Sequence, residues 1–170
     1  MYQINELVVF GNNGVCKIEN IGVPNISGIV KDMQYYTLTS IFSKGSIIYT
    51  PVINSKVSMR KIITIEKAQE LMDNIQSIPI MIVESEKYLD ENYRSAISSQ
   101  KCEDLIQIIK TVYIKQQQKE SEGKKLGQVD ERYMKQAEDM LYSELSIVLD
   151  MPKEKVKAYI NIRALPLEQQ

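Results

Sequence analysis

The sequence contains no histidine and only two cysteines among its 170 residues. Histidine is the commonest general base and a frequent metal ligand, so its absence argues against acid–base catalysis and against a metal site. Cys16 and Cys102 lie far apart and neither belongs to a CxxC pair, which argues against a disulfide framework and a zinc cluster. We interpret both as small buried apolar residues. We therefore predict a protein that is not an enzyme, with no catalytic residue, no metal, no cofactor and no small-molecule substrate.

Long apolar runs are missing as well. No stretch reaches the length of about 18 apolar residues that a membrane-spanning helix needs, and Met1 to Glu6 lacks the basic start and apolar run of a signal peptide. We expect a cytoplasmic protein with no membrane partner. Apolar residues make up 44% and charged residues 25% of the chain, which is typical of a globular protein with a packed core.

The net charge of −1 is not that of a typical nucleic-acid-binding protein, but the charges are unevenly placed. Residues 1–63 hold six lysines and arginines against three acidic residues, a charge of +3, which leaves −4 for residues 64–170. Within the acidic part, residues 110–135 reverse the sign, with seven cationic against four acidic side chains. This local excess of +3 suggests a surface that could face DNA.

The first third of the chain has the pattern of β-strands. An apolar run at 7–10, the turn residues 11–14 and an alternating run at 15–19 predict a hairpin. Residues 34–39 and 46–50, separated by a turn at 43–46, predict a second pair, and Val57 to Ile63 predicts a fifth strand. Five short strands so closely spaced favour a small SH3/Tudor-like β-barrel.

From Thr64 onward the apolar residues recur with the helical period. Thr64 is expected to cap a helix that ends near Ile75, before Pro79. Further helices are predicted at 84–97, 101–120, 130–149 and about 152–160, with a break and new cap at Ser98-Ser99 and a cap at Asp130. We predict an α+β protein of two domains, an SH3/Tudor-like barrel over residues 1–63 and an all-α domain over residues 64–170.

Several motifs resemble the CarD/CdnL family of transcription regulators, whose N-terminal domain is shared with transcription-repair coupling factors. They are the run from Val8 to Ile18, which reads Val-Val-Phe-Gly-Asn-Asn-Gly-Val-Cys-Lys-Ile, the strand before Pro51, and Val129-Asp-Glu-Arg-Tyr-Met134 in the helical half. The likeness spans residues 1 to about 160. The family often has a proline and a second glycine where this chain has Gly11 and Cys16.

The resemblance implies that the N-terminal domain binds the RNA polymerase β subunit by adding a strand to an exposed edge. The strand before Pro51 corresponds to that edge, so the implied contacts are Ile47, Ile48, Tyr49, Thr50, Pro51 and Arg60. Ile47 and Tyr49 alternate and therefore point to one side of the strand. Core packing of these two residues is the competing interpretation, and Arg60 could equally form a local ion pair.

The resemblance also implies that the helical domain contacts promoter DNA at the upstream edge of the melted bubble and modulates open-complex stability. Some relatives insert a tryptophan there, but this chain has none, and the resemblance places Leu89 at or next to that position. The predicted DNA contacts are Tyr88, Tyr93, Arg94, Lys124, Lys125, Arg132 and Lys135. The competing interpretation is a half-buried helix residue for Tyr88 and solvated surface charge for the cations.

Two matters stay open at this point. A protein-interaction adaptor of the transcription machinery that does not touch DNA is the alternative function, and the net charge of −1 favours it slightly. We expect a monomer, although an unpaired edge strand also allows a swapped dimer.

Overall fold

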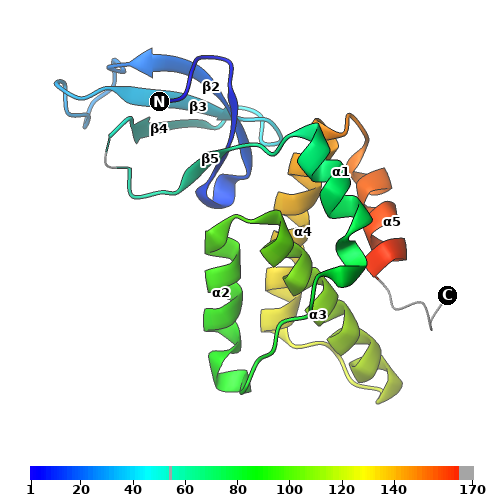
Figure 1. The fold of residues 1–170 in the computed structure, drawn as a ribbon. Coiled ribbons are helices and arrows are strands. Elements are labelled where there is room, and N and C mark those ends of the chain that lie inside the picture. Colours follow the sequence, from blue (N-terminus) through cyan, green and yellow to red (C-terminus); the bar gives the residue numbers. More distant parts are fainter. Residues whose placement is uncertain (54, 165–170) are drawn as a thin grey trace. The chain divides into compact units, whose positions relative to one another are not determined.

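The computed structural model describes residues 1–53 and 55–164, and the chain divides into two compact units, Met1–Ile62 and Ile63–Gln170. The first unit contains one five-stranded antiparallel sheet and the second contains five α-helices (Figure 1). The α+β layout predicted from the sequence is therefore confirmed. Residues 165–170, the end of the predicted helical domain, lie outside the described residues.

The sheet of the first unit has the strand order β4-β3-β2-β1-β5, with every pair antiparallel. Its strands are β1 (Leu7–Phe10), β2 (Val15–Gly22), β3 (Tyr35–Ser40), β4 (Ile47–Pro51) and β5 (Met59–Lys61). The fifth strand is shorter than predicted. The turn between β1 and β2 is a short 3-10 helix, η1 (Gly11–Asn13). A Cβ on Gly11 would come within 2.6 Å of Val57 Cγ1, so glycine lets the segment before β5 pack closely on this turn.

The core of the first unit lies on one face of the sheet. It comprises Val8, Phe10, Cys16, Ile18, Tyr36 and Leu38. Ile48 of β4 and Met59 of β5 pack against the same cluster, although these strands lie at opposite ends of the sheet. The sheet must therefore bend around a single core, as expected for a small barrel-like domain.

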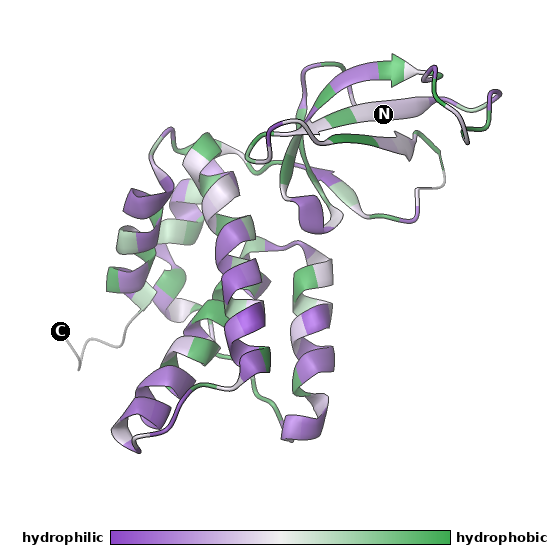
Figure 2. Cartoon of the chain, turned by 180° about the vertical axis from the view of Figure 1, so that it is seen from behind, coloured by the Kyte–Doolittle hydropathy of each residue, from purple (hydrophilic) through white to green (hydrophobic). Residues whose placement is uncertain are grey.

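The second unit buries a continuous apolar core among its helices, and Figure 2 shows hydrophilic and hydrophobic segments alternating along them. The helices are α1 (Ile65–Asp73), α2 (Leu89–Ser99), α3 (Cys102–Ser121), α4 (Gln128–Val148) and α5 (Lys153–Ala164), with short 3-10 helices η2 (Ile75–Ser77) and η3 (Glu86–Tyr88). The Thr64 hydroxyl accepts the Lys67 N–H, so the predicted cap of α1 is confirmed. Within the described residues, no helix is both long and apolar enough to cross a membrane.

The start of α2 was predicted too early, at Glu84 instead of Leu89. The 3-10 helix η3 occupies residues 86–88 directly before it. Earlier in the chain, Lys110 Nζ donates to the carbonyl oxygens of Ile75 at 3.0 Å and Gln76 at 3.1 Å, and also to that of Ile78. These bonds satisfy the carbonyls that end η2, and Pro79 prevents the helix from continuing. Desolvation by burial lowers the pKa of Lys110.

Two predicted caps were also wrong. The break after α2 is made by Gln100, with φ of 57°, and Lys101 is the N-cap of α3, so Ser98-Ser99 remains inside α2. Helix α4 begins at Gln128 with Gly127 as its N-cap, and Asp130 is buried. Asp130 is not the cap because its carboxylate accepts hydrogen bonds from side chains of the neighbouring helices.

Candidate functional site

Strand β4 forms one end of the sheet, and within residues 1–53 and 55–164 no strand pairs with its other side. The Val52 N–H donates to the Gln34 carbonyl at 2.9 Å. Because ladder bonds alternate along an antiparallel pair, residues 48 and 50 also direct their backbone groups to β3. Ile47 and Tyr49 therefore direct their N–H and C=O groups to the open edge.

The side chains of β4 alternate in the same way. Ile48 packs against the core, and Thr50 is buried with its hydroxyl 2.9 Å from that of Ser55. The side chain of Ile47 is 57% exposed and Tyr49 is partly exposed. Of the predicted contacts on this strand, Ile48 and Thr50 are thus turned inward, because alternation places them on the core face. Ile47, Tyr49 and Pro51 remain at the accessible edge.

The opposite edge of the sheet, β5, is occupied by side chains. By the same alternation Met59 and Lys61 direct their carbonyls outward, since the Ile62 N–H donates to the Leu7 carbonyl. The Tyr2 hydroxyl donates to the Met59 carbonyl at 2.8 Å, and Arg60 Nη1 donates to the Lys61 carbonyl at 3.0 Å. Arg60 is separated from β4 by three strands in the sheet order. The structure thus leaves β4 as the edge better suited to accept a partner strand.

Tyr88 and Tyr93, both predicted DNA contacts, differ sharply in exposure. Tyr88 precedes α2 and is 46% exposed, with Lys87 Nζ 5.7 Å from its ring centre. Tyr93 is fully buried, and its hydroxyl donates to Asp130 Oδ1 at 2.7 Å. Burial, together with the adjacent Asp130, raises the pKa of Tyr93, so its hydroxyl stays a donor. The prediction for Tyr93 is wrong because its ring belongs to the core.

Asp130 links three helices through its buried carboxylate. Besides Tyr93 from α2, it accepts Lys115 Nζ from α3 at 3.1 Å. Lys115 also lies 3.6 Å from Glu86. A buried carboxylate is tolerated only when it is paired in this way. The network therefore links α2, α3 and α4, the helices from which the candidate DNA residues extend.

Arg94 and Arg132 meet at a single carboxylate, that of Asp90. Arg94 lies one turn after Asp90 on α2, and its Nη2 contacts Asp90 Oδ2. Arg132 Nη2 of α4 lies 2.6 Å from Asp90 Oδ1, and its guanidinium stacks 4.9 Å from the Tyr133 ring centre. The structure brings these two predicted cations together at Asp90, two residues after Tyr88 in the chain. The sequence interpretation missed Asp90, although its spacing of four residues from Arg94 is typical of a helical ion pair.

Residues 2–63 match the family model of the CarD-like/TRCF RID domain. The N-terminal unit is therefore similar to a CarD-like/TRCF RID domain. Domains of this family interact with RNA polymerase. The family is one of protein-interaction domains and is not a known enzyme family. The open β4 edge and the occupied β5 edge belong to the unit that carries this likeness. No curated protein matches the chain significantly.

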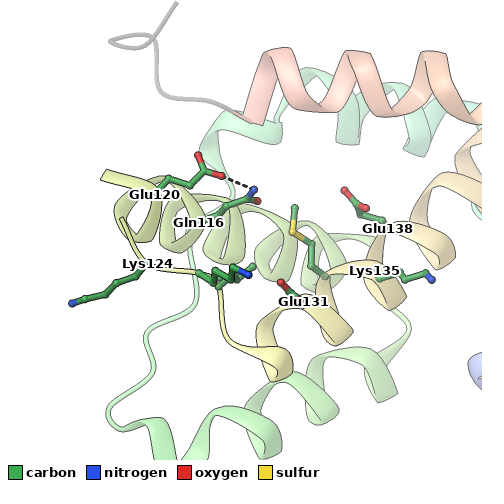
Figure 3. Close-up of a pocket in the computed structure, with 9 residues that line it drawn as sticks. Gln116, Glu120, Lys124, Glu131, Lys135 and Glu138 are labelled. Atoms are coloured by element: carbon green, nitrogen blue, oxygen red, sulfur yellow. Dashed lines mark hydrogen bonds between the residues drawn. The ribbon is translucent and has the colours of Figure 1, made fainter. Parts of the chain in front are cut away.

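Outside the RID domain, the remaining predicted cations surround an open hollow between the end of α3 and the start of α4. Lys124, Lys125 and Lys135 line this hollow of about 370 Å³ together with Glu120, Glu131 and Glu138. Lys124 points away from it and pairs with Glu122 at 2.8 Å (Figure 3). Three lysines and three glutamates offset one another, so the lining has no net charge. Its attraction for phosphate is weaker than the charge count for residues 110–135 predicts.

Proposed function

We propose that the protein is a transcription regulator that binds the RNA polymerase β subunit through β4 and promoter DNA through its helical unit. Contact with the upstream edge of the bubble would change the stability of the open complex, because a ligand shifts an equilibrium by its differential affinity for the two states. The observation that carries the proposal is an RID domain whose β4 edge is open. This function places the protein in the bacterial cytoplasm.

Polymerase binding is supported by the chemistry of the β4 edge. The backbone groups of Ile47 and Tyr49 can continue the sheet with a partner strand, and main-chain hydrogen bonds then supply affinity without requiring particular side chains. Ile47 adds an exposed apolar side chain at the start of the strand. Pro51 has no N–H to donate, which limits the length of strand that can pair.

DNA binding is supported by the group around Tyr88. Leu89, which the resemblance places at or next to the tryptophan of relatives, is buried, so Tyr88 is the neighbouring aromatic residue that stays accessible. A tyrosine ring can stack on an unpaired base, an interaction worth about 1–3 kcal/mol. Arg94 and Arg132 extend from adjacent helices with side chains that are 69% and 62% exposed, positions from which they can reach phosphates.

A polymerase-binding adaptor that does not touch DNA is the second candidate. It is favoured by the carboxylates that already pair with three of the predicted cations, Arg94, Lys124 and Arg132. In this case Tyr88 and the arginines would be ordinary surface residues. Titration of a promoter fragment at low and moderate salt separates the two functions, because an adaptor shows neither binding nor a salt dependence.

Polymerase binding is tested by capture of the intact protein on the purified β lobe. We expect Ile47→Glu to abolish capture, because it places a charge in a contact formed by backbone groups and an apolar side chain. Ile82→Glu is the matched control, since Ile82 is an exposed isoleucine in the helical unit. Capture of Ile47→Glu at the level of the wild type would place the docking surface elsewhere.

A further inference from the structure

Three hydrogen-bond donors from two helices converge on the carboxylate of Asp90, in the first turn of α2. Arg94 contacts Oδ2, while Arg132 Nη2 at 2.6 Å and the Tyr133 hydroxyl at 3.1 Å donate to Oδ1. Desolvation acts to raise the pKa of Asp90, but the bonds from Arg94 and Tyr133 and the charges of both arginines hold it below its ordinary value. Asp90 is therefore an anion at neutral pH.

The group resembles a phosphate site that is already filled by a carboxylate. Guanidinium groups bind carboxylate and phosphate oxygens with the same planar set of donors. Both arginine side chains are more than half exposed, so their ion pairs with Asp90 lie in water and contribute little to stability. An incoming phosphate could therefore take over these donors at small cost. The negative charge of Asp90 would oppose its approach.

We infer that Asp90 is an internal counter-ion that competes with DNA phosphate for Arg94 and Arg132 and keeps the DNA affinity of the free protein low. This inference rests on the proposed function and adds a level of control to it. Once the RID domain holds the protein on polymerase, the helical unit meets promoter DNA at a high effective concentration. Low intrinsic affinity then restricts DNA binding to sites where polymerase is present.

The inference is tested by the affinity of the intact protein for a fluorescent promoter fragment with a pre-melted bubble, measured across a series of salt concentrations. We expect Asp90→Asn to bind about tenfold more tightly at low salt, with a log–log salt slope steeper by about one, because one more unit of positive charge meets the phosphates. Glu91→Gln is the matched control. Glu91 is exposed on the same helical turn and, within the described residues, forms no ion pair. It should leave the affinity close to that of the wild type.

Each outcome bears on a separate claim. If Arg94→Ala with Arg132→Ala binds DNA as the wild type does, the proposed DNA surface is wrong. If the arginines are required but Asp90→Asn binds equally or more weakly, Asp90 does not compete with phosphate. Equal gains from Asp90→Asn and Glu91→Gln would reduce the effect to general charge and overturn the inference. Asp90→Ser, a second neutral variant, guards against a folding defect particular to asparagine.

Discussion

Whether a tyrosine of the helical unit lies in the core or on the surface depends on its hydrogen-bond partner. Tyr88 and Tyr93 are five residues apart, yet one is exposed and the other donates its hydroxyl to a buried carboxylate. Residue type and sequence position do not separate them, because the deciding partner, Asp130, lies 37 residues further along the chain. The buried position of Tyr93 makes its hydroxyl a stabilising group.

We therefore expect Tyr93→Phe to lower the free energy of unfolding by about 1–2 kcal/mol, because Asp130 would lose a buried donor. Urea denaturation followed by circular dichroism measures this change. Tyr88→Phe removes the same hydroxyl from an exposed ring and should leave the unfolding midpoint unchanged. Equal stability of Tyr93→Phe and the wild type would show that the hydroxyl does not stabilise the core.

These residues also show which features of the structure could be predicted from the sequence. The helical period identifies the core of α3 and α4, because burial follows the apolar stripe. The roles of Asp90 and Asp130 depend on side chains brought together from separate helices, so local patterns could not supply them. Asp130 was assigned to a cap for this reason. The charge count for residues 110–135 could not include Asp90, which lies outside that range and pairs with Arg132.

The two edge strands differ in whether their outward backbone groups are free to bind a partner strand. Both β4 and β5 end the sheet, but two outward carbonyls of β5 accept bonds from Tyr2 and Arg60. The resemblance to the CarD/CdnL family implied that the strand before Pro51 is an exposed edge. It could not predict the occupied β5 edge, which depends on Tyr2 reaching residue 59 across the folded unit.

The contribution of the β4 backbone to β-lobe affinity can be measured separately from that of its side chains. Tyr49→Pro removes an N–H that points to the open edge and leaves the bonds to β3 in place. We expect it to weaken β-lobe binding about tenfold more than Tyr49→Ala, which removes the side chain alone, because the lost bond is in the centre of the strand and the proline ring obstructs its partner. Surface plasmon resonance gives both affinities. Equal affinities for the two variants would argue against strand addition.

In the proposed function, one chain combines two weak contacts, that of the N-terminal unit with polymerase and that of the helical unit with DNA. The RID domain carries a charge of +3 over residues 1–62. The helical unit is acidic overall, and two of its exposed arginines, Arg94 and Arg132, are held by Asp90. Neither unit alone has the features of a strong DNA-binding protein. Linking them makes DNA contact depend on polymerase binding, because the second contact becomes intramolecular. The expectation of a monomer stays a prediction.

The lifetime of open complexes tests this account most directly. Polymerase and a labelled promoter fragment are incubated with the protein, challenged with heparin, and followed until the bubble closes. We predict that the wild type lengthens the lifetime severalfold and that Ile47→Glu and the pair Arg94→Ala with Arg132→Ala each remove the effect. A wild type without influence on the lifetime, or variants that lengthen it equally, would contradict the joint action of the β4 edge and the helical unit.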